Sequence, residues 1–464
     1  MGEEDSDHTL PRVTIKKRQG AGSFGINFRL SNDISDDSDP IVRKMLRLVD
    51  DWTSYCITSL QFIPGMSEAG FFFVNHTLEE ADIAFFSSLA IAKEERHDEA
   101  KEETTFSFIF HEDDLSEVAK RMETTSQMLR AAQTVQRSTL SSLIAEFDFF
   151  FSNFLALCAK KFPDRFYDLT EKIALSDLAK YSTMEQVIES RIEKTISRKL
   201  RGAHSDYIEW AFDLLELEKK GKSYTSSQHY KEFLEVCQRR HIMTHNGGVI
   251  NDEYVQKCKT AGLKESEILE VGDAAQIDAR YLKMATARVY LVGYYAAQLF
   301  LQNHYPNDSA ACYANMLSTS HSFLESDQTK MAERIIDFAE FSTRKFDHGL
   351  RLKFGINRAL AKLFDPSLER NQQTALAKTE LEKYDWSVRD PIFELAIAAV
   401  KRDFENIKEL ASLAAQSGLT YSEAKTFVVF REVRELPGFM ECFPRKALQL
   451  ADKRESEMQD QKAC

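Results

Sequence analysis

From Asp113 to about residue 302, apolar residues recur every three or four positions, which is the spacing of an amphipathic helix. The most apolar stretch ends before Pro163, because proline cannot continue a helix. Paired glycines at Gly247-Gly248 favour a helix C-terminus just before them. The pattern predicts one helical domain over residues 113–302. Its predicted helices are Leu140–Lys160, one starting near Ser176-Asp177-Leu178, Met184–Leu200, Asp206–Leu217, Tyr230–Thr244 and Asp278–Leu301.

Residues 307–452 repeat a shorter pattern, with about one helix between successive breaks. Two stretches, Ile356–Ala361 and Leu395–Val400, resemble each other at roughly the spacing of a helical-hairpin repeat. Two architectures fit this pattern: a short α-solenoid of tetratricopeptide type, or an ordinary helical bundle. The predicted helices are Met331–Arg344, Leu350–Leu363, Thr374–Tyr384, Ile392–Arg402, Ile407–Gln416 and Ser422–Arg431.

The N-terminal part has a mixed pattern. Residues 1–45 are polar and rich in aspartate, and residues 453–464 are polar, so both are expected to be tails without a core. Residues 46–112 predict a small α+β module. Its expected elements are β-prone runs at Tyr55–Ile63, Gly70–Val74 and Thr104–Phe110, a helix over Ala81–Ile91, and a solvated loop or helix over Lys93–Glu103.

Composition agrees with a mainly α fold. Glycine (17) and proline (9) are scarce among the 464 residues, while hydrophobic residues make up 43% and include 33 phenylalanines, enough for sizeable cores. The formal net charge is -13, which excludes a general nucleic-acid coat. Any contact with nucleic acid therefore has to occur at a local basic site.

The seven cysteines include no CxxC pair, so a disulfide framework or a zinc ribbon is not expected and a reducing cytoplasm fits best. The N-terminal segment MGEEDSDHTL is acidic and lacks the apolar region of a signal peptide. The apolar stretch Val289–Leu301 is too short to span a bilayer. We therefore expect a cytoplasmic protein without a membrane segment.

Chemistry concentrates in the run Arg239-Arg240-His241-Ile242-Met243-Thr244-His245-Asn246-Gly247-Gly248, at the end of a predicted helix. His241 and His245 are four residues apart and share one helix face. Histidine exchanges protons near neutral pH, and arginine offers a fixed charged fork to phosphate oxygens. Together they can promote attack by the 2′-OH of RNA on the adjacent phosphorus without a metal.

The bare spacing from arginine to histidine is weak support, because about two such pairs arise by chance in a chain like this. Arg198 and His204 form another. Two simpler interpretations of residues 239–248 stay open. In one, His245 beside Asn246 only caps the helix; in the other, Arg239 and Arg240 are a solvated pair of surface charges.

The fuller pattern resembles a known family. Arg240-His241-x-x-x-His245 matches the R-(N/H/D)-x-x-x-H signature of HEPN domains, the higher eukaryote and prokaryote nucleotide-binding group, and RRHIMTHNGGVINDEYV is similar to the RRNxxxHNGGxVxxxY form of bacterial members. The resemblance runs from the helix with Glu146 to Tyr254 and leaves out the N-terminal module.

The resemblance implies a helical domain and, in active members, a metal-independent RNase whose site forms across a homodimer, often in a toxin or an antiphage effector. It makes Arg240 and His245 the catalytic pair and His241 a polar helper, with Arg239 and Asn246 supporting them. Many members also use an acidic or polar residue from an earlier helix, for which Glu146 and Asp148 are candidates.

Inactive members are scaffolds, so an interaction protein is the alternative. In either case the C-terminal repeats offer a surface for a regulatory protein or ligand.

No cofactor and no metal are expected. Gly20–Gly25 fits a GxGxxG pattern but lies in the predicted tail and has no strand–helix context. His241-x-x-x-His245 has zinc spacing but lacks the glutamate of H-E-x-x-H, because Ile242 stands there.

Overall fold

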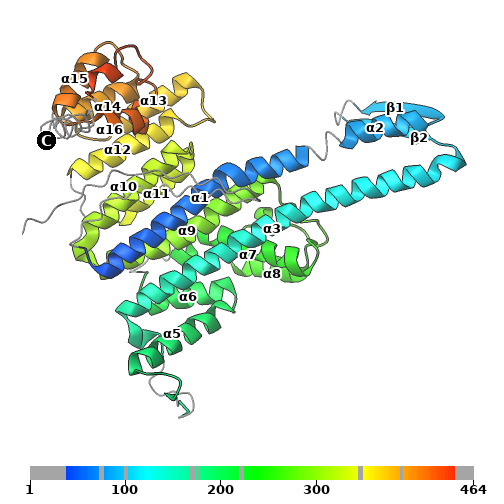
Figure 1. Ribbon diagram of the computed structural model, residues 1–464, viewed down its shortest axis with the longest axis horizontal. Helices are drawn as coiled ribbons and strands as arrows, with labels where there is room; N and C mark the ends of the chain where they lie inside the picture. The colour runs from blue at the N-terminus through cyan, green and yellow to red at the C-terminus, as the bar shows by residue number, and fades with distance from the viewer. Residues whose placement is uncertain are drawn as a thin grey trace, which may run out of the picture. The chain divides into compact units, whose positions relative to one another are not determined.

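The computed structural model describes residues 38–72, 78–98, 103–167, 173–174, 178–218, 224–342, 348–386 and 390–444. The described part is mainly helical, which confirms the predicted fold class (Figure 1). Its one sheet is an antiparallel pair of strands. The expected tail at 453–464, nearly all of that at 1–45, and the helix start at Ser176-Asp177 lie outside these residues.

Three long helices form the central core: α1 (Pro40–Phe72), α3 (Leu115–Lys161) and α9 (Ala279–His304), each in contact with the other two. The Trp52 ring stacks 5.0 Å from Phe150, and its Nε1 donates to the carbonyl of Tyr290 at 3.1 Å. Gly293 lets α9 approach this closely, because a Cβ there would lie 2.6 Å from the Phe150 ring.

Helix α1 corrects the prediction of a β-run at Tyr55–Ile63, and it begins inside the segment expected to be a tail. The run is rich in β-branched and aromatic residues, which favour strands. Its buried positions, however, follow a helical spacing through Met45, Val49, Trp52, Cys56 and Leu60. Burial against α3 and α9 therefore overrides local propensity, and this segment belongs with the central helices.

The small module is α2 (Leu78–Leu89) beside β1 (Ala92–Asp98) and β2 (Glu103–Ile109). Two of the predicted elements, the helix over Ala81–Ile91 and the strand over Thr104–Phe110, are confirmed. The expected loop or helix over Lys93–Glu103 is wrong, because residues 93–98 lie in β1. Pairing with β2 explains it: Lys93 lies opposite Phe108, and its ammonium sits 4.3 Å from the centre of the Phe106 ring. Of the run Gly70–Val74, residues 70–72 end α1 and the rest lie outside the described residues.

Shorter helices surround the central three, and polar caps explain where they start. Thr183, Ser227, Asn251 and Asp278 each accept a backbone N–H from the first turn that follows. The predicted bounds of α5, α6, α7 and α9 agree with the structure to within a few residues, whereas α3 begins at Leu115 instead of the predicted Leu140 and α8 was not predicted. The observed bounds are α5 (Met184–Leu200), α6 (His204–Leu214), α7 (Gln228–His245) and α8 (Asp252–Thr260).

In the described part of the chain seven helices follow α9. Each of α10 to α14 contacts the next helix in the chain, while α10 also contacts α12 and α12 contacts α14. Contacts of this kind are typical of stacked helical hairpins. The two similar stretches, Ile356–Ala361 and Leu395–Val400, lie in α12 and α14. The helices are α10 (Ser309–Glu325), α11 (Thr329–Ser342), α12 (His348–Leu363), α13 (Arg370–Leu381), α14 (Pro391–Lys401), α15 (Ile407–Gln416) and α16 (Tyr421–Thr426).

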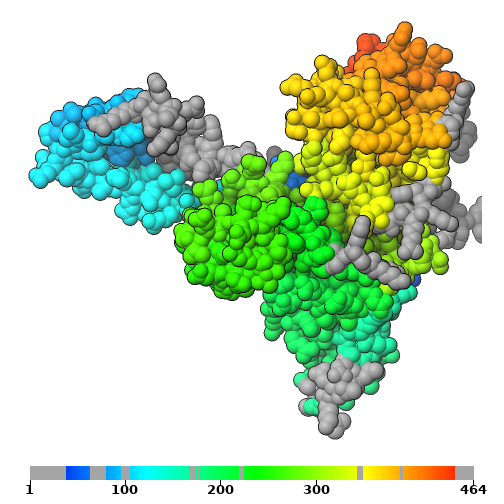
Figure 2. All heavy atoms as spheres, turned by 180° about the vertical axis from the view of Figure 1, so that it is seen from behind, coloured from blue at the N-terminus to red at the C-terminus, as the bar shows by residue number. Residues whose placement is uncertain are grey.

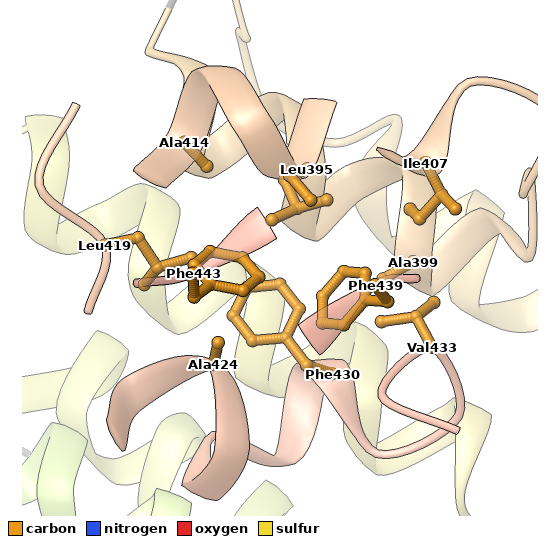
Figure 3. Packing of buried hydrophobic residues seen from close by; sticks show 11 residues of the cluster. Leu395, Ala399, Ile407, Ala414, Leu419, Ala424, Phe430, Val433, Phe439 and Phe443 are labelled. Carbon is orange, nitrogen blue, oxygen red and sulfur yellow. The ribbon is translucent and has the colours of Figure 1, made fainter. Parts of the chain in front are cut away.

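The predicted helix Ser422–Arg431 is wrong in its second half. α16 ends at Thr426, Phe427 is extended, and a 3₁₀ turn follows at Val428–Phe430. The break turns Phe430 and the residues after it onto α14 and α15 (Figure 3). The segment thus covers the apolar side of the last helices with a cluster of Phe430, Val433, Phe439 and Phe443 packed on Leu395, Ala399, Ile407, Ala411, Ala414, Leu419 and Ala424.

One helix, residues 112–161 counted with its first turn, is long and apolar enough to cross a membrane by length and composition. Half of its apolar window is buried in the protein. α1, α5, α7 and α9 contact it, which is how a core helix is covered.

A polar chain joins α1, α9 and α10 beside the core. Gln298 Nε2 donates to Asn315 Oδ1 at 2.8 Å, and Asn315 Nδ2 donates to Asp50 Oδ1 at 2.7 Å. Burial and the charge of Asp51 raise the pKa of Asp50 to about 6, against the hydrogen bond from Asn315. The folded protein therefore binds this proton more tightly than the unfolded chain does.

We expect Asp50→Asn to raise the free energy of unfolding by about 1 kcal/mol near pH 8, because the ionised carboxylate is the form that burial disfavours. Stability contributed by a raised pKa is fully present only below the unfolded value of 3.8 and is lost as pH rises through about 6, so the gain should vanish only once the pH falls below 3.8. Urea unfolding near pH 8 and below pH 3.8 measures it. Asp51→Asn, at an exposed neighbour whose charge is a smaller cause of the raised pKa than burial, should give a smaller gain. An equal gain at both pH values would contradict the role given to the Asp50 proton.

Candidate functional site

Helix α7 ends where the glycine pair predicts. The N–H groups of Asn246 and Gly248 both donate to the carbonyl of Ile242, at 2.9 and 3.2 Å. Gly247 and Gly248 have φ of 62° and 89°, a left-handed conformation that glycine adopts without strain. The turn places His245 in the last helical turn and leaves residues 244–247 exposed.

The two histidines of the motif meet on one face. The ring centroids of His241 and His245 are 4.7 Å apart with an interplanar angle of 47°. His245 is exposed and His241 is half-buried. Figure 2 shows the green segment that contains α7 and α8 at the surface of the face drawn. A ligand in solvent can therefore reach both rings.

The environment of His241 favours its neutral form. Burial, a charge on His245 and the ammonium of Lys257 lower the pKa of His241 below the ordinary value of 6.5, and Glu253 opposes them. Glu253 is itself paired with Lys257 at 2.7 Å. At neutral pH His241 therefore has a ring nitrogen free to accept a proton.

Arg240 is the arginine of the motif that the fold leaves unused. Its Nε is buried and has no hydrogen-bond partner within the described part of the chain. A buried donor without a partner costs about 1–3 kcal/mol, so such an atom calls for an explanation. Its charge also contributes to the lowered pKa of His241. A bound oxyanion would satisfy it.

Arg137 of α3 is a further cation beside the motif. Its guanidinium lies 3.4 Å from where a Cβ on Gly248 would stand, and no ion pair or hydrogen bond holds it within the described ranges. Sequence reasoning missed it, because nothing near Arg137 in the chain marks it. Only the contact of α3 with α7 brings it to the glycine turn.

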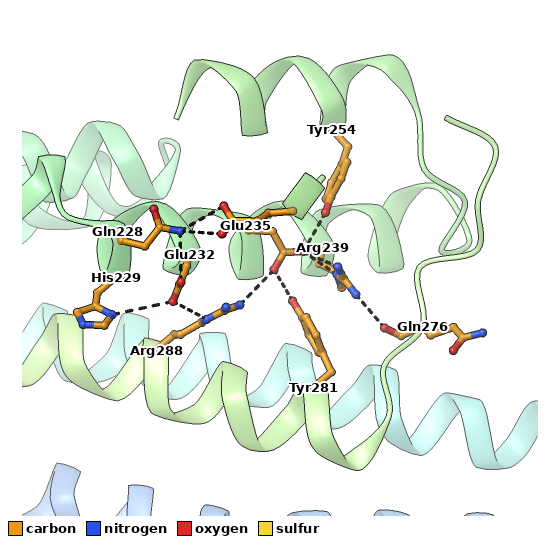
Figure 4. A network of polar contacts seen from close by, with 10 residues as sticks. Gln228, His229, Glu232, Glu235, Arg239, Tyr254, Gln276, Tyr281 and Arg288 are labelled. Carbon is orange, nitrogen blue, oxygen red and sulfur yellow. Dashed lines mark hydrogen bonds and ion pairs between the residues drawn. The ribbon is translucent and has the colours of Figure 1, made fainter. Parts of the chain in front are cut away.

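Arg239 has a structural role instead (Figure 4). It donates to the carboxylate of Glu235 through Nε at 2.7 Å and to the carbonyl of Gln276 at 3.0 Å, and its guanidinium stacks 4.1 Å from the ring of Tyr281. Glu235 is 4% exposed and also accepts the hydroxyls of Tyr254 and Tyr281, at 2.9 and 3.0 Å. The arrangement fixes α7 against α8 and α9, so Arg239 is not available to a ligand.

The earlier-helix candidates do not join the motif. Asp148 accepts the hydroxyl of Tyr207 at 2.7 Å and lies 3.3 Å from His204 Nε2. Burial disfavours the charged His204 ring, but Cys237 and Asp148 outweigh it and raise the pKa of His204. Asp148 thus holds α6 to α3. Glu146 is exposed, and no contact with the motif is seen.

Asn246 also serves the turn, because its Nδ2 donates to the carbonyl of Val249. The structure therefore brings together the rings of His241 and His245, leaves the adjacent Arg240 without a side-chain partner among the described residues, and assigns Arg239, Asp148 and Asn246 to the fold.

Comparisons with known proteins add no assignment: no family model, no curated protein and no solved structure matches the chain. Within the described residues, no group of three or more histidine, cysteine, aspartate or glutamate side chains is placed to hold a metal ion. The site's chemistry is therefore argued from its own geometry.

We expect Glu235→Gln to lower the free energy of unfolding by about 3 kcal/mol at neutral pH, because it leaves the Arg239 charge buried without its counter-ion. Urea unfolding followed by circular dichroism measures the loss. Glu232→Gln is the matched control one turn away: Glu232 accepts from Arg288 at 3.1 Å but is 21% exposed, so its loss should be about 1 kcal/mol or less. Equal losses in the two variants would contradict the central role of Glu235.

Proposed function

We propose that this chain is an endoribonuclease of HEPN type that cleaves RNA without a metal. The observation that carries the proposal is the buried, unpartnered Nε of Arg240 beside the paired rings of His241 and His245. A guanidinium that the fold does not use, next to two groups that exchange protons, suits a phosphodiester that is attacked by its own 2′-OH.

The proposed catalytic role of each side chain follows from its charge. Arg240 stabilises the extra negative charge on the phosphorane oxygens, with Arg137 within reach of the same phosphate backbone. The neutral ring of His241 accepts the proton of the 2′-OH, whose oxygen bonds to phosphorus. A protonated His245 gives a proton to the 5′-oxygen as the P–O bond to it breaks. The products are a 2′,3′-cyclic phosphate and a 5′-hydroxyl.

The working form is proposed to be a homodimer. The motif lies at an exposed helix end, and the run of residues 239–248 occurs once in the chain. Val249, beside the glycine turn, is 46% exposed and offers an apolar contact to a second copy. Two motifs facing each other would enclose the phosphate that one exposed motif leaves in solvent.

In the cell, the protein would act as a regulated cytoplasmic toxin or antiphage effector. Its C-terminal helices would be the surface that binds a regulator.

Purified protein should cleave single-stranded RNA in EDTA and leave cyclic-phosphate ends. His245→Ala should slow cleavage by about 10²-fold or more, and Arg240→Ala by a similar factor, because each removes proton transfer or charge stabilisation. Denaturing gels with end-group analysis measure both. Arg198→Ala, from the other arginine-to-histidine spacing, is the control and should cleave normally.

Absent cleavage in a dimeric, folded protein would contradict the nuclease and favour the scaffold alternative. A strict monomer that still cleaves would contradict the dimeric site alone.

Cleavage should also depend on pH in a defined direction. Because the pKa of His241 is lowered below 6.5, its ring remains a proton acceptor at neutral pH, and the rate should fall only as the solution becomes more acidic than that value. Single-turnover rates across pH locate this acidic limb. In Lys257→Ala, which removes one cause of the lowered pKa, the limb should move to higher pH. An unmoved limb would show that another group is the base.

A further inference from the structure

An open pocket of about 450 Å³ lies between α13 and the end of α14, and its lining contains several hydrogen-bond donors. This pocket is called the hollow below. Arg370, Thr374 and Lys378 line it from α13, where their i, i+4, i+8 spacing puts them on one face. Asn371 adds an amide from the same face. Lys401 and Arg402 line it from the end of α14.

Arg402 forms a fixed floor for this hollow. It adopts a left-handed conformation with φ of 55°, which is strained for a residue other than glycine. Its guanidinium holds Glu432 at two points, at 2.6 and 2.7 Å, and also donates to Thr374 Oγ1 at 2.7 Å. These bonds hold α13, α14 and the C-terminal segment in register, so the lining is positioned in advance.

The cations at the mouth are left uncompensated. Lys378 and Lys401 are exposed, and neither has an ion-pair or hydrogen-bond partner in the part of the chain that the structure describes. Arg370 is 73% exposed, and among the described residues its guanidinium pairs with Glu432 alone, at 3.8 Å. Three positive side chains converge here although the whole chain carries a net charge of -13.

We propose that this hollow binds a small ligand with two or more linked phosphates, such as a nucleoside polyphosphate. The ammonium groups of Lys378 and Lys401, the exposed guanidinium of Arg370 and the amide of Asn371 are donors that phosphate oxygens accept, while Arg402 and Thr374 are already hydrogen-bonded within the protein. The volume suits a compact ligand, since small-molecule sites span about 300–1,000 Å³. Aromatic side chains are absent from its lining, so recognition rests on the phosphates.

A second basic hollow, of about 360 Å³ on α5, provides the comparison. Lys194, Arg198 and Arg201 line it too, but Glu193 lies among them and they come from α5 and the residue that follows it. Among the described residues, no second helix contributes to its lining. It therefore serves as a control for non-specific attraction of anions.

The test is isothermal titration calorimetry of the full chain with inorganic pyrophosphate and with ATP. We expect saturable binding by wild type and a loss of about tenfold or more in Lys378→Ala/Lys401→Ala, because two converging charges are removed from exposed positions. Lys194→Ala/Arg198→Ala should bind as wild type does. Binding should also persist in Arg240→Ala, which separates this hollow from the motif on α7.

Either of two results would overturn the proposal: no saturable binding of pyrophosphate or ATP to wild type, or equal affinity in the Lys378→Ala/Lys401→Ala variant. A third would replace the occupant: if the variant loses affinity for an RNA oligonucleotide while neither phosphate probe binds, the hollow is an RNA contact. Thermal unfolding of each variant confirms that it remains folded.

Discussion

The buried carboxylate of Glu235 is the interaction on which the candidate site depends. It takes hydrogen bonds from tyrosines on α8 and α9 and pairs with Arg239 one turn further along α7. Because an α-helix advances 100° per residue, fixing Arg239 inward turns Arg240 to another side, next to His241. The fold thus engages Arg239 in hydrogen bonds and a ring contact, while the Nε of Arg240 has no partner among the residues that the structure describes. Because Arg239 holds the helix in place, the neighbouring Arg240 remains available for the proposed chemistry.

Much of the fold could be predicted from the sequence where burial and local chemistry agree. Helices α5, α7, α8 and α9 start at polar caps, and α7 stops at a glycine pair, so these ends are marked by residues near them in the chain. The predictions were wrong where tertiary contacts, not local sequence, determine the secondary structure. The β-branched residues of α1 become helical because α3 and α9 bury its apolar stripe, and the charged segment of β1 becomes a strand because β2 pairs with it.

The candidate site shows the same limit. The rings of His241 and His245 meet as their spacing predicts. The structural roles of Arg239 and Asp148 could not be predicted, because their partners Tyr281 and Tyr207 are distant in the sequence. The role of Asn246 depends on the geometry of the glycine turn, which brings the carbonyl of Val249 to its side chain. Arg137 approaches Gly248 only through the contact of α3 with α7. Likewise, the lining of the hollow between α13 and α14 is positioned by Arg402, whose left-handed conformation no sequence motif predicts.

The most direct measurement of the central claim is a histidine side-chain NMR titration with a 2′-deoxy oligonucleotide, which can bind but cannot be cleaved. The account predicts that the ring resonances of His241 and His245 shift together and saturate, while those of the half-buried His204 and His321, which lie outside the motif, stay in place. Shifts at His204 without change at His241 and His245, or no saturable shift at the pair, would contradict the claim that the end of α7 receives the phosphate.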